Sequence, residues 1–205
     1  QQSKEELLTK LHPASGSKIG LLIGGTSSVC YFSKEFIYSL FDKLKTVCEE
    51  EQASILLTTS RRTPVEIEKW VQEKVCKQPY LLYALYASSD SYNPVPGILA
   101  YCDVIMVTED SYSMISEAAS VEKPVLVLRL YHKKHKLLKY ERSLEEMDRL
   151  GFIKRIDLSE SEMILREVLS NPGSFSAQAS TDTQRATRVL RELLFNNNRE
   201  WTVTK

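Results

Sequence analysis

Cysteine is scarce in this sequence and shows no pattern typical of a metal site or a disulfide framework. Four cysteines, Cys30, Cys48, Cys76 and Cys102, are spread over 205 residues without a C-x-x-C pair. Structural zinc sites and small disulfide-stabilised domains typically have closely spaced cysteines. We therefore predict reduced thiols that serve as small buried apolar side chains, as in a protein of the cytosol, and we predict no metal site.

Net charge and long apolar segments are also lacking. The 27 basic and 27 acidic residues give a formal net charge of zero, which argues against a dedicated nucleic-acid-binding surface. No apolar run approaches the ~20 residues that a membrane-spanning helix needs, and no signal or transit peptide is evident. These features predict a cytoplasmic location. The chain begins Gln-Gln-Ser rather than with Met, so we also expect a fragment or a processed chain.

The two common glycine-rich phosphate motifs, G-x-G-x-x-G and the P-loop, are missing as well. In their place, an apolar segment at 18–23 ends in Gly24, Gly25 and Thr26. Two glycines after a buried strand allow backbone N–H groups to approach a ligand closely. The same pair also suits a tight turn between a strand and a helix, and the sequence leaves both interpretations open.

What the chain does contain is a regular alternation of short apolar segments and helical periodicity. Strands are predicted at 18–23, 54–59, 80–86, 104–107, 124–130 and 152–156, with helices between them. This alternation indicates an α/β fold with a doubly wound, mainly parallel sheet of about six strands, which is Rossmann-like. We predict a linker with a short helix at 1–17, one domain at 18–170, a mobile loop at 171–182, and a final helix and tail at 183–205.

Capping residues predict where three of the helices begin. Ser33 is a candidate N-cap, Thr63 is a candidate cap before Pro64, and Ser159 opens a Ser-x-x-Glu-like start. Each of these side chains can accept a hydrogen bond from a backbone N–H group of the first helical turn. Gly151 is a candidate end for the helix that precedes it.

A pair of arginines follows the second predicted strand. Ser60, Arg61 and Arg62 come directly after the segment at 54–59. The carboxyl ends of parallel strands form the edge where open α/β sheets bind ligands, and the guanidinium group matches phosphate geometry. We therefore expect at least one arginine to contact a bound phosphate. A solvated loop charge or a salt bridge is the alternative.

The stretch at 102–131 predicts a strand, a polar turn, a helix and a second strand. Its polar turn at 108–111 stands between a buried strand and the start of a helix. Such turns hold anions in α/β folds, because backbone N–H groups at a helix start point toward the ligand. We therefore predict that 110–117 forms one wall of a nucleotide-diphosphate site.

The segment at 129–142 is densely basic and contains His132 and His135. It suits a lid over an anionic ligand, a patch for an acidic membrane, or a solvated loop and helix face, and the sequence leaves the three open. The sequence indicates no cysteine or carboxylate partner for the histidines, which argues against a metal site. A catalytic role for one of these two histidines is left open by the sequence.

Two motifs carry a family resemblance: Thr-Ser-Arg-Arg-Thr-Pro at 59–64 and Thr-Glu-Asp-Ser-x-Ser-Met-x-Ser-Glu-Ala at 108–118. They resemble the mitochondrial-fission (elongated-mitochondria) family and its bacterial relatives, over about residues 18–155. More distantly, the segment is similar to the C-terminal, donor-binding half of glycosyltransferases with the GT-B fold and to UDP-N-acetylglucosamine 2-epimerases. It departs from the epimerase pattern at Tyr112 and Ser113, where those proteins have two glycines.

The resemblance implies roles for individual residues. The 111–113 turn would hold a diphosphate, Glu117 would accept hydrogen bonds from ribose hydroxyls, and Arg62 would add positive charge. The first loop would face the phosphates, and the 86–97 loop would lie near the base. The candidate ligand-binding residues are Gly24, Gly25, Thr26, Ser60, Arg61, Arg62, Asn93, Asp110, Ser111, Ser113 and Glu117. The alternatives are N-capping for Ser111 and Ser113 and a surface salt bridge for Glu117.

The resemblance leaves the activity open between two classes. The first is a glycosyltransferase or epimerase whose ligand is a nucleotide-diphosphate sugar, with no other cofactor. A GT-B protein needs about twice this length, so we expect a missing N-terminal half to be a partner and name no catalytic residue. The second is a non-enzymatic scaffold that recruits a dynamin-like GTPase to the mitochondrial outer membrane, on its cytosolic face, through peripheral membrane contact.

Overall fold

The computed structural model describes residues 15–27, 30–89, 92–132, 138–171, 173 and 175. The predicted helix within 1–17, the final helix and tail at 183–205 and most of the loop at 171–182 lie outside the described residues. Within the described part, helices and strands alternate along the chain, as the sequence predicts.

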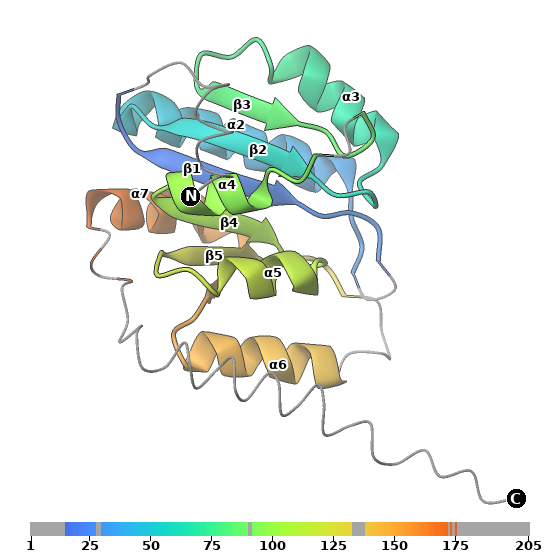
Figure 1. Cartoon of the computed structure of the whole chain (residues 1–205), viewed down its shortest axis with the longest axis vertical. Helices are drawn as coiled ribbons and strands as arrows, with labels where there is room; N and C mark the ends of the chain where they lie inside the picture. The colour runs from blue at the N-terminus through green and yellow to red at the C-terminus, as the bar shows by residue number, and fades with distance from the viewer. Residues whose placement is uncertain are drawn as a thin grey trace, which may run out of the picture.

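One parallel sheet forms the centre of the molecule (Figure 1). Its six strands lie in the order β3-β2-β1-β4-β5-β6, and every neighbouring pair is parallel. The strands are β1 (Lys18–Ile23), β2 (Ser54–Thr59), β3 (Leu81–Leu85), β4 (Val104–Thr108), β5 (Val125–Leu128) and β6 (Lys154–Ile156). The predicted fold class is therefore confirmed.

Helices cover both faces of the sheet (Figure 1). One apolar cluster joins the sheet to α2 (Lys34–Glu51), α3 (Val65–Lys74) and α7 (Ser161–Ser170). The other joins it to α4 (Val95–Tyr101), α5 (Tyr112–Ala118) and α6 (Leu138–Arg149). Because both faces are covered, the central strands are apolar on both sides, and all residues of β1 and β4 are buried.

Of the three helix starts predicted from capping residues, the structure confirms one and contradicts two. The Ser33 hydroxyl accepts a hydrogen bond from the Phe36 N–H group, so that N-cap is confirmed. Thr63 is not a cap: Pro64 holds that position, and the Thr63 hydroxyl donates to the Gly24 carbonyl instead. The predicted start at Ser159 is also wrong, because a capping box at Asp157 opens a 3₁₀ turn, Leu158–Glu160, ahead of α7.

The strand order places a switch point between β1 and β4. From β1 the chain moves outward through β2 to β3, then returns to β4 and continues to β6 on the other side. In open α/β sheets, ligands bind outside the carboxyl ends of the strands at such a point.

Among the helices of the described residues, none combines the length and apolarity needed to cross a bilayer.

Candidate functional site at the carboxyl edge of the sheet

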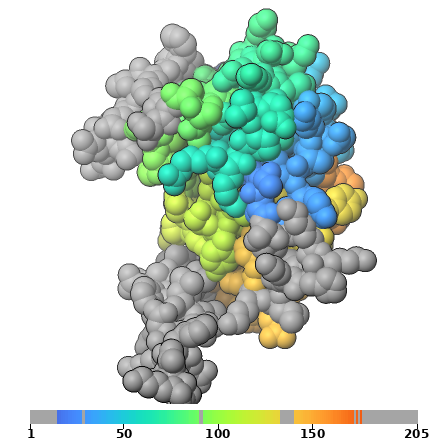
Figure 2. All heavy atoms as spheres, turned by 90° about the vertical axis from the view of Figure 1, so that its right-hand side faces the viewer, coloured from blue at the N-terminus to red at the C-terminus, as the bar shows by residue number. Residues whose placement is uncertain are grey.

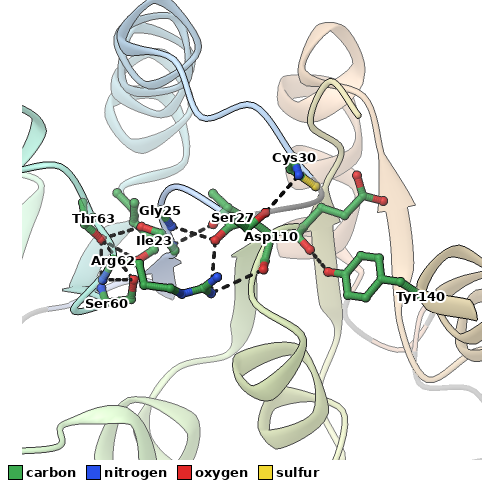
Figure 3. Close-up of polar contacts among 12 residues, drawn as sticks. Ile23, Gly25, Ser27, Cys30, Ser60, Arg62, Thr63, Asp110 and Tyr140 are labelled. Carbon is green, nitrogen blue, oxygen red and sulfur yellow. Dashed lines mark hydrogen bonds and ion pairs between the residues drawn. The ribbon is translucent and has the colours of Figure 1, made fainter. Parts of the chain in front are cut away.

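At the switch point, the loop after β1 is hydrogen-bonded to the turn after β4. The Gly24 N–H group donates to the Thr108 hydroxyl at 2.7 Å, and the Gly25 N–H group donates to Asp110 Oδ2 at 2.7 Å. The next residue, Thr26, donates its N–H group to the Arg62 carbonyl at 3.1 Å. Three segments after three different strands are thus tied together (Figure 3).

The two glycines are required by the protein's own packing. A Cβ atom on Gly25 would lie 2.0 Å from the Arg62 carbonyl oxygen and 2.5 Å from the Thr63 nitrogen. A Cβ atom on Gly24 would lie 2.1 Å from the Asp110 carboxylate. The space that the sequence interpretation gives to a phosphate is therefore occupied by a backbone carbonyl and a carboxylate, which supports the tight-turn interpretation.

Asp110 points into the fold rather than into open space. Its side chain is fully buried, and Oδ1 has no hydrogen-bond partner among the described residues. Burial raises the pKa of this carboxyl above its ordinary value of 3.8, while hydrogen bonds from Gly25 and Thr108 and the nearby Arg62 oppose that shift. Arg62 Nη2 lies 3.4 Å from Oδ2, with its side chain 45% exposed (Figure 3). This carboxylate thus holds the loops together.

A cleft of about 840 Å³ opens next to this contact, at the carboxyl ends of β2 and β3. Most of the candidate residues line it, namely Ser60, Arg61, Arg62, Asn93, Ser111, Ser113 and Glu117. Gly24, Gly25, Thr26 and Asp110 are not among its lining residues. Figure 2 looks onto this edge, where the turquoise atoms after β2 lie near the yellow-green atoms of α5.

The cleft has walls of opposite charge. Arg61 and Arg62 contribute two exposed guanidinium groups on the β2 side. Ser113 and Glu117, one helical turn apart on α5, contribute an exposed hydroxyl and a carboxylate on the other side. Ser111 is the N-cap residue of α5 by position, but its side chain makes no capping hydrogen bond, and this residue also lines the cleft.

A buried glutamate supports the polar floor of the cleft, and the sequence gives no sign of it. Glu68 on α3 is 2% exposed, and its carboxylate accepts hydrogen bonds from the Thr59 and Ser88 hydroxyls, both of which line the cleft. The Thr59 hydroxyl accepts in turn from the Ala87 N–H group at 2.9 Å. Glu68 looks like one more polar residue of an amphipathic helix, so only the packing of α3 against β2 and β3 indicates its role.

A second polar cluster lies beyond the switch point, around Glu109. Its Oε1 is 3.0 Å from Arg155 Nε, and both side chains are almost fully buried. Its Oε2 lies 3.0 Å from the Leu130 nitrogen and 2.9 Å from His132 Nε2. The Tyr140 hydroxyl donates to the Glu109 carbonyl, and in Figure 3 it points at this turn.

This cluster corrects the interpretation of His132. The sequence indicates no cysteine or carboxylate partner for that histidine, but the structure places both Glu109 and Cys30 beside it. Cys30 and His132 also form an isolated antiparallel bridge. These residues are separated by long stretches of sequence, so no local spacing signals the cluster. His135 and the rest of 133–137 lie outside the described residues.

Sequence comparison identifies the relatives of this chain. The profile of a family described as mitochondrial fission ELM1 matches residues 1–194. The mitochondrial fission protein ELM1 of Arabidopsis thaliana is 31% identical over 173 residues, which are 83% of this chain. The chain belongs to the mitochondrial fission ELM1 family. Membership confirms the resemblance carried by the 59–64 and 108–118 motifs.

The solved structures that share the fold of this chain include an epimerase and a synthase. A protein described as a UDP-N-acetylglucosamine 2-epimerase from Listeria monocytogenes matches with a TM-score of 0.55 at 16% identity, over 94% of this chain and 51% of its own. A UDP-forming α,α-trehalose-phosphate synthase from Burkholderia xenovorans matches with a TM-score of 0.57 at 12% identity, over 96% of this chain and 45% of its own. At such identities the likeness concerns the fold alone, and it fits one half of a GT-B protein.

The chain spans only part of the proteins it resembles. It covers 36% of the Arabidopsis protein and about half of each of the two solved chains, 51% and 45%. The activity, substrates and partners of those whole proteins are therefore matters for proposal.

Proposed function

We propose that the cleft at the carboxyl ends of β2 and β3 binds a nucleotide-diphosphate sugar. The observation that carries this proposal is the pairing of Arg61 and Arg62 on one wall with Ser113 and Glu117 on the other. Guanidinium groups suit a diphosphate, and a carboxylate suits hydroxyl donors such as those of ribose. The two walls thus match the two chemical parts of one ligand.

The size and position of the cleft support the same ligand. A volume of about 840 Å³ falls within the range of small-molecule sites, which is roughly 300–1,000 Å³. Asn93, Ser88 and Ser89 line the cleft from the segment between β3 and α4, which resemblance assigns to the base. The solved relatives named above include an epimerase and a synthase whose descriptions name UDP or a UDP-sugar.

Turnover is a further step, which we propose only for an assembled two-half protein. In that assembly, the arginines would stabilise a departing diphosphate while the sugar undergoes transfer or epimerisation. The facing half would supply the acceptor site and the general base. The described chain by itself is proposed to bind the ligand and not to transform it.

The test is a thermal-shift screen against UDP-, GDP-, ADP- and CMP-sugars, followed by calorimetric titration of any hit. At a ligand concentration of about 100 Kd, the free energy of unfolding rises by about 2.7 kcal/mol, which corresponds to several degrees in Tm. Glu117→Gln is expected to weaken binding at least tenfold. The matched control is Glu145→Gln, since Glu145 is exposed on α6 and does not line the cleft.

A second candidate function is suggested by the family itself, which is named for mitochondrial fission. In this case the domain is a scaffold that brings a dynamin-like GTPase to the cytosolic face of the mitochondrial outer membrane. Suppose that no nucleotide sugar raises Tm and that cells producing the Glu117→Gln protein keep mitochondria of normal length. The ligand-binding hypothesis is then rejected, and the scaffold hypothesis is retained. A Tm shift that is lost in Glu117→Gln rejects a purely structural role.

A further inference from the structure

We propose that Cys30, Glu109 and His132 form a binding site for a zinc-like divalent metal ion. The cysteine sulfur, a histidine ring nitrogen and a carboxylate oxygen all lie within 4.8 Å of one another. None of the three residues lines the sugar-nucleotide cleft. The site is therefore separate from the proposed function, and either proposal can fail without the other.

The donor set matches the coordination chemistry of zinc. Thiolate, imidazole and carboxylate are the three protein ligand types that Zn²⁺ prefers, at bond lengths of roughly 2.0–2.3 Å. In a tetrahedral site such bonds place the ligand atoms roughly 3.3–3.8 Å from one another. The separations of up to 4.8 Å exceed these values by at most roughly 1.5 Å, so side-chain adjustments on the order of 1 Å would let the three donors surround an ion. Three protein ligands leave a fourth position for water, which is the arrangement of an open rather than a closed zinc site.

The glutamate has one oxygen directed toward the metal position. Arg155 binds Oε1 through Nε and Nη2, which fixes the carboxylate and leaves Oε2 for other contacts. Oε2 accepts one hydrogen bond from the Leu130 N–H group at 3.0 Å. It also lies 2.9 Å from His132 Nε2, and a metal ion between the two would replace that hydrogen bond.

The surroundings of the histidine resemble the outer shell of a metal ligand. While Nε2 of His132 faces Glu109, Nδ1 lies 3.9 Å from Glu141 Oε1. Histidines that bind a metal with one nitrogen usually donate the other N–H group to a carboxylate, which orients the ring and raises its basicity. At 3.9 Å Glu141 makes no hydrogen bond to Nδ1, and it would act as a positioning residue by approaching Nδ1 when the ion binds.

The cysteine is held by the backbone and buried. Its N–H group donates to the Ser27 hydroxyl at 2.9 Å, and its side chain is 0% exposed (Figure 3). It faces His132 across the isolated bridge, in which the Tyr31 N–H group also donates to the Tyr131 carbonyl at 2.7 Å. A metal ion would join the loop after β1, the turn after β4 and the segment after β5.

The experiment is a Co²⁺ titration of the whole chain in metal-free buffer, followed by displacement with Zn²⁺. We expect one Co²⁺ per chain, a thiolate-to-cobalt charge-transfer band, and tetrahedral d–d bands that Zn²⁺ removes. Cys30→Ser should abolish the charge-transfer band, and His132→Gln should weaken binding at least tenfold. Glu141→Gln should weaken binding less than His132→Gln does, because Glu141 Oε1 lies 3.9 Å from Nδ1 and is not a metal ligand. Cys76→Ser, which alters an exposed thiol away from the cluster, should leave the spectrum unchanged.

A wild-type spectrum without a thiolate band overturns the proposal and leaves a purely hydrogen-bonded cluster. The same holds if the band survives Cys30→Ser or disappears in Cys76→Ser. X-ray absorption of the zinc-loaded wild type tests the site without any variant, so a misfolded Cys30→Ser does not weaken the experiment. One sulfur in the first shell supports the site, and a shell without sulfur rejects it.

Discussion

The backbone N–H group of Gly25 donates to Asp110 Oδ2 at 2.7 Å, directly at the switch point of the sheet. This hydrogen bond crosses 85 positions of sequence and joins the loop after β1 to the turn after β4. It fills the position where a doubly wound fold usually binds its ligand. The open cleft therefore lies to one side, at the ends of β2 and β3.

Gly25→Ala should destabilise the fold strongly for its size. The added Cβ atom would meet the Arg62 carbonyl at 2.0 Å and the Thr63 nitrogen at 2.5 Å, and both are backbone atoms that cannot move aside independently. We expect a loss of about 1–3 kcal/mol, measured by urea unfolding. Gly173→Ala is the control, since its Cβ atom would meet only Asn171 Oδ1 at 3.6 Å. Equal stability of the two variants would contradict the packing of the first loop.

Asp110→Asn should change how stability depends on pH. The pKa of Asp110 is raised above 3.8 in the folded state, so the folded protein holds this proton more tightly than the unfolded chain. As pH rises from 3.8 through the folded pKa, the wild type therefore loses stability. The neutral amide lacks this loss. Urea unfolding at several pH values measures the free energy of unfolding of both proteins. As pH rises over that interval, the stability of Asp110→Asn relative to the wild type should increase, and above the interval it should stay constant. A difference that shifts in favour of the wild type would mean a lowered pKa.

Arg155→Met should be among the most destabilising substitutions in the chain. Arg155 and Glu109 are 3% and 0% exposed, so the variant leaves a buried carboxylate without its cation. Breaking such a pair costs about 3–5 kcal/mol. The control is Arg166→Met, which breaks a pair with Glu50 whose side chains are 32% and 54% exposed, and should cost under about 1 kcal/mol. Chemical denaturation of both variants compares the two losses, and similar losses would refute the burial argument.

Arg61→Ala and Arg62→Ala should separate ligand binding from stability. Both arginines line the cleft, but only Arg62 is paired with Asp110. Each variant should weaken nucleotide-sugar binding about tenfold or more, because a charged hydrogen-bond donor is lost. Arg61→Ala should keep the wild-type Tm. Arg62→Ala should lower Tm slightly, because the free energy of unfolding falls by up to about 1 kcal/mol when the contact with Asp110 is lost. Calorimetry and thermal unfolding measure the two effects, and unchanged affinity in both variants would place the phosphates outside this wall.

The cleft was largely predictable because its position follows from topology. Arg61 and Arg62 come after β2, and Ser113 and Glu117 lie on the helix after β4. All strands are parallel, so their carboxyl ends meet at one edge whatever the details of packing. Hydrophobic periodicity alone indicates the strands, and the predicted limits of β1 and β2 are those observed.

Other expectations failed because they depend on which atoms fill a given space. Thr63 has the sequence position of a cap, but its hydroxyl is taken by the loop after β1. For Gly24 and Gly25 the sequence leaves a phosphate loop and a tight turn open, and the carboxylate and carbonyl that lie where their Cβ atoms would be favour the tight turn. The helix start predicted at Ser159 was also wrong. The backbone geometry there instead lets Asp157 and Glu160 form a capping box, which opens a 3₁₀ turn.

By itself, the sequence determined the order of helices and strands, the parallel sheet and the family. These follow from local periodicity and from motifs of adjacent residues. Only the tertiary structure decided what Asp110, Glu109 and His132 contact. Their partners Gly25, Arg155 and Cys30 are brought to them by strand order and register, over separations that no local pattern encodes. The 102–131 stretch therefore contributes to three features: the cleft wall, the contact that closes the switch point, and the proposed metal site.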